Sequence, residues 1–219
     1  GRDRRCHGRN ARPSSSAPPE QESHQEQMTS RRKIVTVFGS SRPHPGEAQY
    51  SVAQELGGEL ARQKFIVCSG GYAGTMEAVS RGAKESGGHT IGIAANFFKA
   101  RANQFIDEEI RTKTWQDRLF ALIDRGDAFI ACPGGTGTLV ELAIVWEMLN
   151  KHVVSGKPLV VLGEFWHPII DRVREIELGH ETRWGEKQKS LIHRATFPAD
   201  AATFLAEFFA KPKAPRRSR

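Results

Sequence analysis

Short apolar runs alternate with longer stretches of helical spacing along most of this chain. The runs at 34–38 (IVTVF) and 159–162 (LVVL) are almost continuously apolar. Strands have this composition when both faces of their sheet are buried, and helices are the usual connections between parallel strands. The pattern therefore predicts one α/β domain, with a Rossmann-like, doubly wound parallel sheet that helices cover on both faces.

The expected elements follow from the periodicity of apolar residues and from the glycines that end them. We expect strands at 34–38, 65–68, 90–93, 128–132, 158–162 and 191–195. We expect helices at 47–63, 75–86, 115–125, 138–150, 168–177 and 200–210. Residues 94–110 are expected to form a loop, with room for a short strand near 109–112, and residues 181–189 a polar loop.

Both ends of the chain are basic and poor in apolar residues. Residues 1–33 and 211–219 carry +4 and +5 of the net charge of +7, so the domain at 34–210 carries −2. We expect both tails to be disordered, because they cannot bury enough apolar surface to offset chain entropy. A domain without net positive charge also lacks the basic face that nucleic-acid binding needs, so we expect no nucleic-acid partner.

The first 27 residues precede Met28, and we interpret them as a leader outside the domain, translated upstream or vector-like. An organelle transit peptide is the alternative, which Glu20, Glu22 and Glu26 argue against. No apolar stretch approaches the roughly 20 residues that span a bilayer, so we expect no membrane association. The three cysteines show no paired spacing, which favours a reducing, cytoplasmic location.

Three expected strands end in small, glycine-rich turns. In doubly wound sheets, ligands bind beyond the carboxyl ends of the strands, and the following helix offers unpaired N–H groups to an anion. A single turn of this kind often has only a structural role, but three together indicate a phosphate site. The candidate binding residues are Gly39, Ser40, Gly70, Gly71, Gly74, Thr75, Gly134, Gly135, Thr136, Gly137 and Thr138.

Two nucleotide-binding motifs are missing. There is no G-x-x-x-x-G-K-[ST] segment, so the chain is not a P-loop nucleotide hydrolase, and the first strand is not followed by G-x-G-x-x-G. The predicted phosphate site is therefore more consistent with a bound mononucleotide than with a dinucleotide.

Glu141 and Arg118 are the candidate catalytic residues. We place Glu141 in the first turn of its helix, three residues after Thr138. A carboxylate beside a bound phosphate is electrostatically unfavourable, so its presence there indicates a function. Its alternative role is that of a capping residue. Arg118 can hold phosphate or ribose oxygens with its planar guanidinium, or can be a solvated helix residue. Arg42 is a weaker phosphate candidate.

Other conspicuous residues favour structural roles. The helix at 139–150 is apolar around most of its circumference, which indicates burial in the core or at a subunit interface. Cys68 and Cys132 end strands and are expected to be inert thiols, and the histidines show no metal-ligand spacing. Trp115, Trp146 and Phe97-Phe98 are expected to pack in the core or at an interface, with a purine pocket as the alternative.

Residues 133–141, PGGTGTLVE, match the PGGxGTxxE signature of the LONELY GUY (LOG) family, and the chain resembles that family from about Ile34 to Phe209. Gly70-Gly71-x-x-Gly74-x-Met76 is similar to the family's second turn, and Arg118 falls in its M-x-x-R-K segment. The resemblance implies a homodimer with shared active sites that hydrolyses the N-glycosidic bond of a nucleoside 5′-monophosphate. It implies Arg118 and Glu141 as the catalytic pair, phosphate binding by residues of the 134–138 turn, and no cofactor or metal.

The chain departs from the family pattern around the expected site. Leu119 and Trp115 replace the lysine and methionine of M-x-x-R-K, and Glu77 and Ser69 replace glycines of the second turn. The resemblance implies AMP or an N6-modified AMP, such as a cytokinin ribotide, as the substrate. The alternative is a non-catalytic binding or carrier protein for a nucleotide or a phosphorylated cofactor, such as the molybdenum cofactor.

Overall fold

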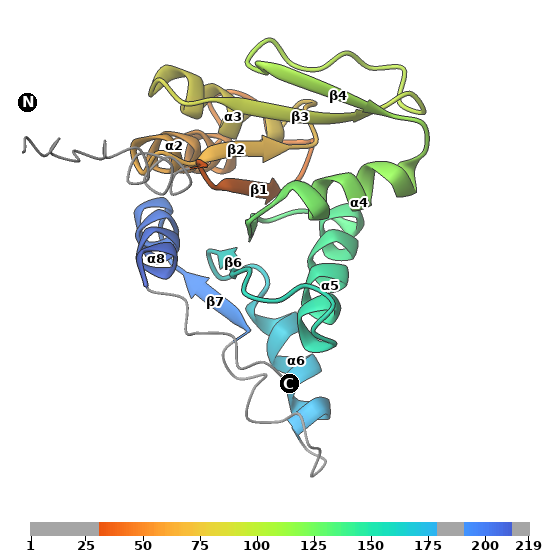
Figure 1. The fold of residues 1–219 in the computed structure, drawn as a ribbon, viewed down its shortest axis with the longest axis vertical. Helices are drawn as coiled ribbons and strands as arrows, with labels where there is room; N and C mark the ends of the chain where they lie inside the picture. Colours follow the sequence, from red (N-terminus) through yellow and green to blue (C-terminus); the bar gives the residue numbers. More distant parts are fainter. Residues whose placement is uncertain (1–30, 179–190, 212–219) are drawn as a thin grey trace, which may run out of the picture. The chain divides into compact units, whose positions relative to one another are not determined.

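Seven parallel strands form one sheet in the computed structural model, which describes residues 31–178 and 191–211 (Figure 1). The sheet order is β4-β3-β2-β1-β5-β6-β7. The strands are β1 (Ile34–Phe38), β2 (Ile66–Ser69), β3 (Thr90–Ala95), β4 (Glu108–Thr112), β5 (Ala128–Ala131), β6 (Leu159–Leu162) and β7 (Ile192–Ala195). The predicted doubly wound, Rossmann-like α/β class is confirmed.

The strand order reverses between β1 and β5. The chain builds β1 to β4 outward on one side of the sheet, then returns to place β5 beside β1 and continues through β6 and β7 on the other side. Phe38 pairs with Ala131, so the turns that follow these two strands leave the sheet side by side. This reversal is the topological switch point at which doubly wound sheets bind their ligands.

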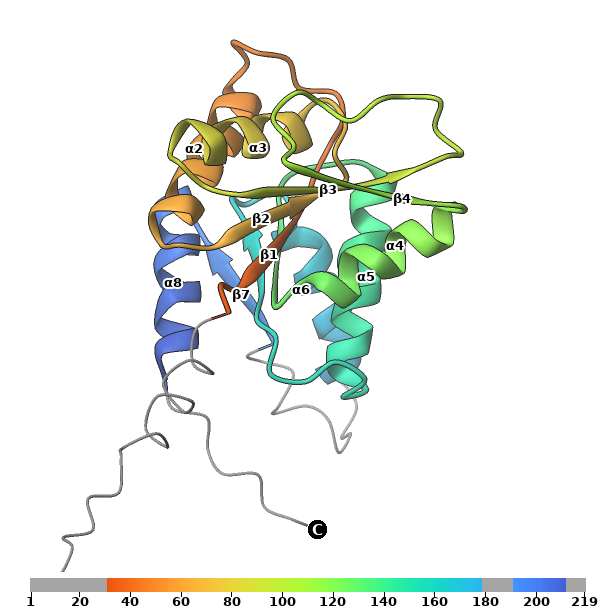
Figure 2. The same ribbon diagram turned by 45° about the horizontal axis from the view of Figure 1, so that its top comes forward.

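Helices cover both faces of the sheet (Figure 2). One face carries α2 (Ala48–Arg62), α3 (Thr75–Glu85) and α8 (Pro198–Ala210), and the other carries α4 (Trp115–Arg125), α5 (Thr136–Asn150) and α6 (His167–Leu178). Between them, β1 and β6 are buried along their whole length, as their apolar runs predicted.

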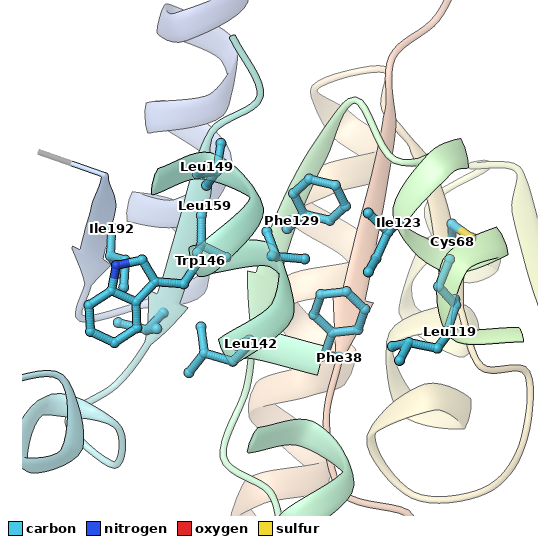
Figure 3. Close-up of a cluster of buried hydrophobic side chains, with 14 of the residues drawn as sticks. Phe38, Cys68, Leu119, Ile123, Phe129, Leu142, Trp146, Leu149, Leu159 and Ile192 are labelled. Carbon is cyan, nitrogen blue, oxygen red and sulfur yellow. The ribbon is translucent and has the colours of Figure 1, made fainter. Parts of the chain in front are cut away.

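The core lies on both sides of the sheet. Beneath α4 and α5, the rings of Phe38 and Phe129 stack with their centroids 6.1 Å apart (Figure 3). Leu142 projects from α5 into the same cluster and is 1% exposed. Truncation of such a residue to alanine costs about 2–5 kcal/mol, so the core holds α4 and α5 firmly against the switch point.

Several element boundaries differ from the expected ones. β4 is a full strand, one residue longer than the short segment expected at 109–112, and its polar sequence suits a partly exposed edge strand. Helix α8 begins at Pro198 rather than residue 200, since proline is favoured in a first helical turn. The expected loop at 181–189 and the greater part of both expected tails lie outside the described residues.

The position of Glu141 in its helix needs a correction. We placed Glu141 in the first turn, but α5 begins at Thr136, two residues earlier than expected, which puts Glu141 in the second turn. The threonines and Gly137 belong to the helix itself and not to the preceding loop. A role for Glu141 as a cap or as a first-turn partner of the helix dipole is therefore removed.

The helices were compared in length and apolar composition with membrane-spanning segments. Among residues 31–178 and 191–211, no helix combines the length and the apolar composition that crossing a membrane requires.

Candidate functional site

A cavity of about 910 Å³ opens at the switch point, beyond the carboxyl ends of β1 and β5. The loops after both strands, the start of α5 and one side of α4 form its walls. The predicted site residues that line it are Gly39, Ser40, Arg118, Gly134, Gly135, Thr136, Gly137, Thr138 and Glu141. Arg42, the weaker phosphate candidate, also lines the cavity.

The start of α5 is built to receive an anion. The first hydrogen bond at this end of the helix runs from the Leu139 amide to the Gly135 carbonyl (3.0 Å), so the amides of residues 136–138 precede the helical ladder. No acidic residue lies in this first turn. The amides and the positive end of the helix dipole together favour a bound anion such as a phosphate.

Gly135 and Gly137 owe their lack of a side chain to the cavity rather than to the fold. A Cβ atom added to either residue would meet nothing within 4 Å, and neither has the positive φ that favours glycine. Both line the cavity. Glycine here keeps open the space in which a ligand can approach the backbone closely.

The turn before α5 is fixed from behind. The Cys132 amide donates to the Phe38 carbonyl (2.9 Å), and the indole N–H of the buried Trp166 donates to the Cys132 carbonyl (2.9 Å). At Gly134 a Cβ would overlap the hydroxyl oxygen of Thr138. The helix start therefore presents a set backbone geometry to the cavity.

The second glycine-rich turn has a different position from the one expected. Gly70, Gly71, Gly74 and Thr75 were predicted to bind phosphate, but they are not among the residues that line the cavity. The Thr75 amide donates to the Ser40 carbonyl (2.8 Å), and Gly74, at φ +72°, lies where a Cβ would overlap that same carbonyl. Gly74 and Thr75 therefore support the first turn, at 39–41, from outside the cavity, whereas Tyr72 of the same turn lines it.

Gly70 leaves the space that the Arg118 guanidinium occupies. The Arg118 guanidinium is buried, and its Nε and Nη2 donate to the backbone carbonyls of Ile93 (2.7 Å) and Gly70 (3.2 Å). A Cβ at Gly70 would overlap Nη2. The rings of Tyr72 and Phe98 lie 5.4 and 5.9 Å from the guanidinium carbon, within reach of a cation–π interaction. Arg118 is thus held at the cavity wall in one orientation, which excludes the solvated alternative.

Glu141 lies half-buried in the opposite wall, on α5. Burial raises the pKa of its carboxyl to about 7, and the charge of Arg118 opposes this shift without cancelling it. Burial also lowers the pKa of Arg118, against the charge of Glu141. A carboxyl that titrates near neutrality can both accept and return a proton during a reaction.

The departures from the family pattern fall in different places. Leu119 is buried beside Phe38 and forms part of the cavity wall (Figure 3). Glu77 is not a lining residue, and its carboxylate accepts a hydrogen bond from the Tyr50 hydroxyl (3.0 Å). The replacement at 119 therefore changes the site, whereas the replacement at 77 serves the contact between α2 and α3.

The aromatic residues divide between the core and the cavity. Trp146 is buried in the core, as expected (Figure 3). Trp115 and Phe98 line the cavity, which was the alternative interpretation, and Tyr72 and Phe165 join them. The sequence signal for the last two was their position a few residues after a strand end, and Tyr72 also lies within a glycine-rich turn.

The remaining reactive groups have no evident role in chemistry. Cys68 and Cys132 are fully enclosed, and burial raises the pKa of each thiol to about 12, so neither is a ready nucleophile. Within the described part of the chain, no three His, Cys, Asp or Glu side chains gather closely enough to hold a metal ion.

The sheet order and the cavity at its switch point define a Rossmann-like α/β protein in which the start of a helix lines the cavity. The chain belongs to the SLOG cluster4 family, whose model matches residues 32–183.

Named relatives are about one third identical to the chain over the residues that align. It is 32% identical over 149 residues to the cytokinin riboside 5′-monophosphate phosphoribohydrolase of Rhodococcoides fascians, covering 64% of this chain and 74% of that protein. It is 34% identical over 138 residues to the enzyme of the same name from Mycobacterium tuberculosis, covering 61% and 72%. Among solved structures, it is similar to the Moco carrier protein of Chlamydomonas reinhardtii, with a TM-score of 0.62 and 26% identity, covering 83% of this chain and 100% of that one.

Proposed function

We propose that the chain hydrolyses the N-glycosidic bond of a nucleoside 5′-monophosphate, such as AMP or a cytokinin ribotide, to the free base and ribose 5-phosphate. The observation that carries this proposal is the placement of Glu141 and the clamped Arg118 in one cavity with the glycine-lined start of α5. The names of the relatives from Rhodococcoides fascians and Mycobacterium tuberculosis agree with it.

The phosphate would bind at the amides of residues 136–138. Binding at this remote group holds the ribose in place and contributes free energy to the orientation of its C1′ atom. Arg42 and Ser40, on the loop after β1, line the same cavity and can add donors to the phosphate.

Glu141 would act on the bond itself. As the bond from C1′ to the base nitrogen breaks, positive charge develops on the ribose, and the ionised carboxylate stabilises it. The same carboxylate takes a proton from the water whose oxygen bonds to C1′ and later releases it, and the departing base nitrogen takes up one proton. The hydrolysis therefore consumes one water and no net proton. Arg118 would hold a ribose or phosphate oxygen through Nη1. Its other two nitrogens, Nε and Nη2, donate to backbone carbonyls and fix the orientation of the guanidinium. These steps require no cofactor.

The second candidate function is non-catalytic carriage of a nucleotide or of a phosphorylated cofactor such as the molybdenum cofactor. The likeness to the Moco carrier protein favours it, as does the large size of the cavity. A carrier gains little from a half-buried carboxyl near the phosphate, because the two negative charges repel each other. Glu141 therefore favours the hydrolase.

The test is to incubate the protein with AMP and with isopentenyladenosine monophosphate and to measure the free base by chromatography. Glu141→Gln should lower base release at least about a hundredfold while nucleotide binding persists. Glu147→Gln is the matched control, since Glu147 lies exposed on the same helix and outside the cavity. If the wild-type protein binds these monophosphates tightly and releases no base from either, the carrier function replaces the hydrolase.

We also propose that two copies of the chain associate through α5. Val140, Ile144 and Met148 on this helix are only partly covered by the chain's own core, and Ile169 and Val173 on α6 are exposed in a small pocket that α5 and α6 form. A second copy would cover these side chains and remove their apolar surface from water. Light scattering at micromolar concentration should give the mass of a dimer, and Ile144→Glu should give a monomer. A monomeric wild-type protein would overturn this proposal.

A cytoplasmic location is the compartment we propose, since Cys68 and Cys132 are both free and buried. Fractionation of cells that express the chain tests it, and recovery of the chain in a membrane or secreted fraction would contradict it.

A further inference from the structure

Three large aromatic side chains that line the cavity are left exposed by the fold. Phe98 and Trp115 are each 38% exposed, and Phe165 is 51% exposed. Exposed aromatic side chains scattered over a surface need no explanation, but several that line one cavity mark a binding site for a ligand with apolar faces.

Two of these rings sit on firmly held backbone. Phe98 packs edge-to-face against Tyr72, with the ring centroids 5.6 Å apart, and the Tyr72 hydroxyl both donates to the Ala95 carbonyl (3.2 Å) and accepts from the Ala95 amide (2.9 Å). Trp115 is the first residue of α4, directly after Thr114, which exchanges capping hydrogen bonds with Asp117 (3.0 and 3.2 Å). Phe98 and Trp115 therefore offer ring faces that need little ordering when a ligand binds.

These rings adjoin the reactive pair. Phe98 lies 5.9 Å from the guanidinium carbon of Arg118, and Trp115 precedes Arg118 by three residues, on the same side of α4. The glycine-lined phosphate turn, in contrast, belongs to β5 and α5. With the phosphate at α5 and the glycosidic bond beside Arg118, the base would lie against the part of the cavity wall that Phe98 and Trp115 form next to Arg118.

We propose that Phe98 and Trp115 are the base-binding residues of the cavity and favour a flat bicyclic base by stacking against it. This inference rests on the proposed function, because it takes the position of the phosphate and the reacting bond from it. Stacking strengthens with the area of the rings in contact, so a purine monophosphate binds more tightly here than a pyrimidine monophosphate. The indole at 115 offers the larger of the two faces.

The experiment measures binding by calorimetry in the full-length Glu141→Gln variant, which holds nucleotides without turnover. AMP is compared with UMP and with ribose 5-phosphate, which keeps the phosphate and ribose but lacks a base. We expect AMP to bind about tenfold or more tightly than ribose 5-phosphate. Adding Trp115→Ala should remove most of this difference and leave the affinity for ribose 5-phosphate unchanged, whereas Trp115→Phe should restore much of it. Adding Phe98→Ala should weaken AMP by a larger factor than ribose 5-phosphate, whose affinity can fall slightly because Phe98 also contacts Arg118.

Phe120→Ala is the matched control, because Phe120 is an exposed aromatic residue of the same helix that does not line the cavity. It should change neither affinity. In the active protein, Trp115→Ala should raise KM for AMP more than it lowers kcat.

The outcomes separate this inference from the proposed function. If AMP and ribose 5-phosphate weaken equally in the alanine variants, or if neither weakens, the stacking proposal is wrong even where AMP is hydrolysed. If AMP binding weakens selectively while the active protein releases no base from any monophosphate, the base-binding wall is supported and the hydrolase is rejected.

Discussion

The turns at 69–75 and 133–138 look alike in sequence, yet their glycines exist for different reasons. In the first, Gly70 and Gly74 lie where a Cβ would overlap Arg118 or the Ser40 carbonyl, so glycine is required by the chain itself. In the second, Gly135 and Gly137 border empty space in the cavity. The glycines of one turn support the site from outside and those of the other face it, although a sequence motif assigns phosphate binding to both.

The comparison teaches that a glycine-rich turn near a site cannot be assigned from composition alone. What distinguishes the two turns is the identity of the atoms that a side chain would meet. Substitutions of Gly70 or Gly74 in the supporting turn should damage the fold or the position of Arg118, and substitutions of Gly135 or Gly137 in the facing turn should damage only ligand binding.

The largest effect is expected from Gly70→Ala. The new methyl group must displace the end of the Arg118 side chain, and misplacing such a group by about 1 Å can cost about a hundredfold in rate. Base release should fall about as far as in Arg118→Ala, with an unchanged circular dichroism spectrum. The double variant should be no worse than either single one. Multiplied losses in the double variant would mean that Gly70 acts independently of Arg118.

Glu141, on the helix that follows the facing turn, makes the stability of the protein depend on pH. The pKa of Glu141 is about 7 in the folded protein and near 4.5 when unfolded, so the folded state holds its proton over the interval between them. The stabilisation from the raised pKa is complete below pH 4.5 and is lost as pH rises through 7. Partial exposure leaves an effect of about 2 kcal/mol.

Denaturant unfolding of wild type and Glu141→Gln at pH 4.5 and pH 8 checks this expectation. The variant should be the more stable of the two at pH 8 and lose that advantage at pH 4.5. The same relative stability at both pH values would show that Glu141 does not titrate between them.

Gly74→Ala should lower stability by about 1–3 kcal/mol. The backbone at Gly74 has φ +72°, and the added methyl group would press on the Ser40 and Ser41 backbone. Thermal unfolding measures the change. Gly46→Ala is a useful control, since Gly46 also has a positive φ but nothing within 4 Å, so any excess loss at Gly74 reports the steric contact.

The smallest change in stability is expected at Gly137. Alanine suits a helix better than glycine, so Gly137→Ala should leave the melting temperature unchanged or slightly higher. The affinity for AMP should nevertheless fall about tenfold, because the methyl group occupies the space of the ligand. Unchanged affinity would mean that the phosphate does not lie at this turn.

The sequence predicted most of the fold because its strands are buried on both faces. β1 and α4 have the expected bounds, and the apolar run of β1 explains why. β4 was predicted only in part, because this edge strand is largely exposed and its sequence, EEIRT, is polar. The start of α5 was missed because threonine and glycine are weak helix formers, and here the tertiary context overrides that propensity.

The site was less predictable than the fold. The motif pointed to Arg118, Glu141 and the 134–138 turn, which the structure brings to one cavity. The Arg118 guanidinium donates to the backbone carbonyls of Gly70 and Ile93, which are far from it in the sequence. Every residue has a backbone carbonyl, so no sequence pattern predicts these hydrogen bonds. Phe165 belongs to a loop with no motif, so only its position after β6 could have suggested it.

The hydrogen bond from the Trp166 indole to the Cys132 carbonyl bears on the kinetics of ligand capture. This bond and the pairing of Phe38 with Ala131 set the helix start before a ligand arrives. A phosphate then meets a preformed surface and waits for no loop to close over the turn. Association should therefore be a single concentration-dependent phase in stopped-flow mixing, with a rate set by diffusion into the cavity.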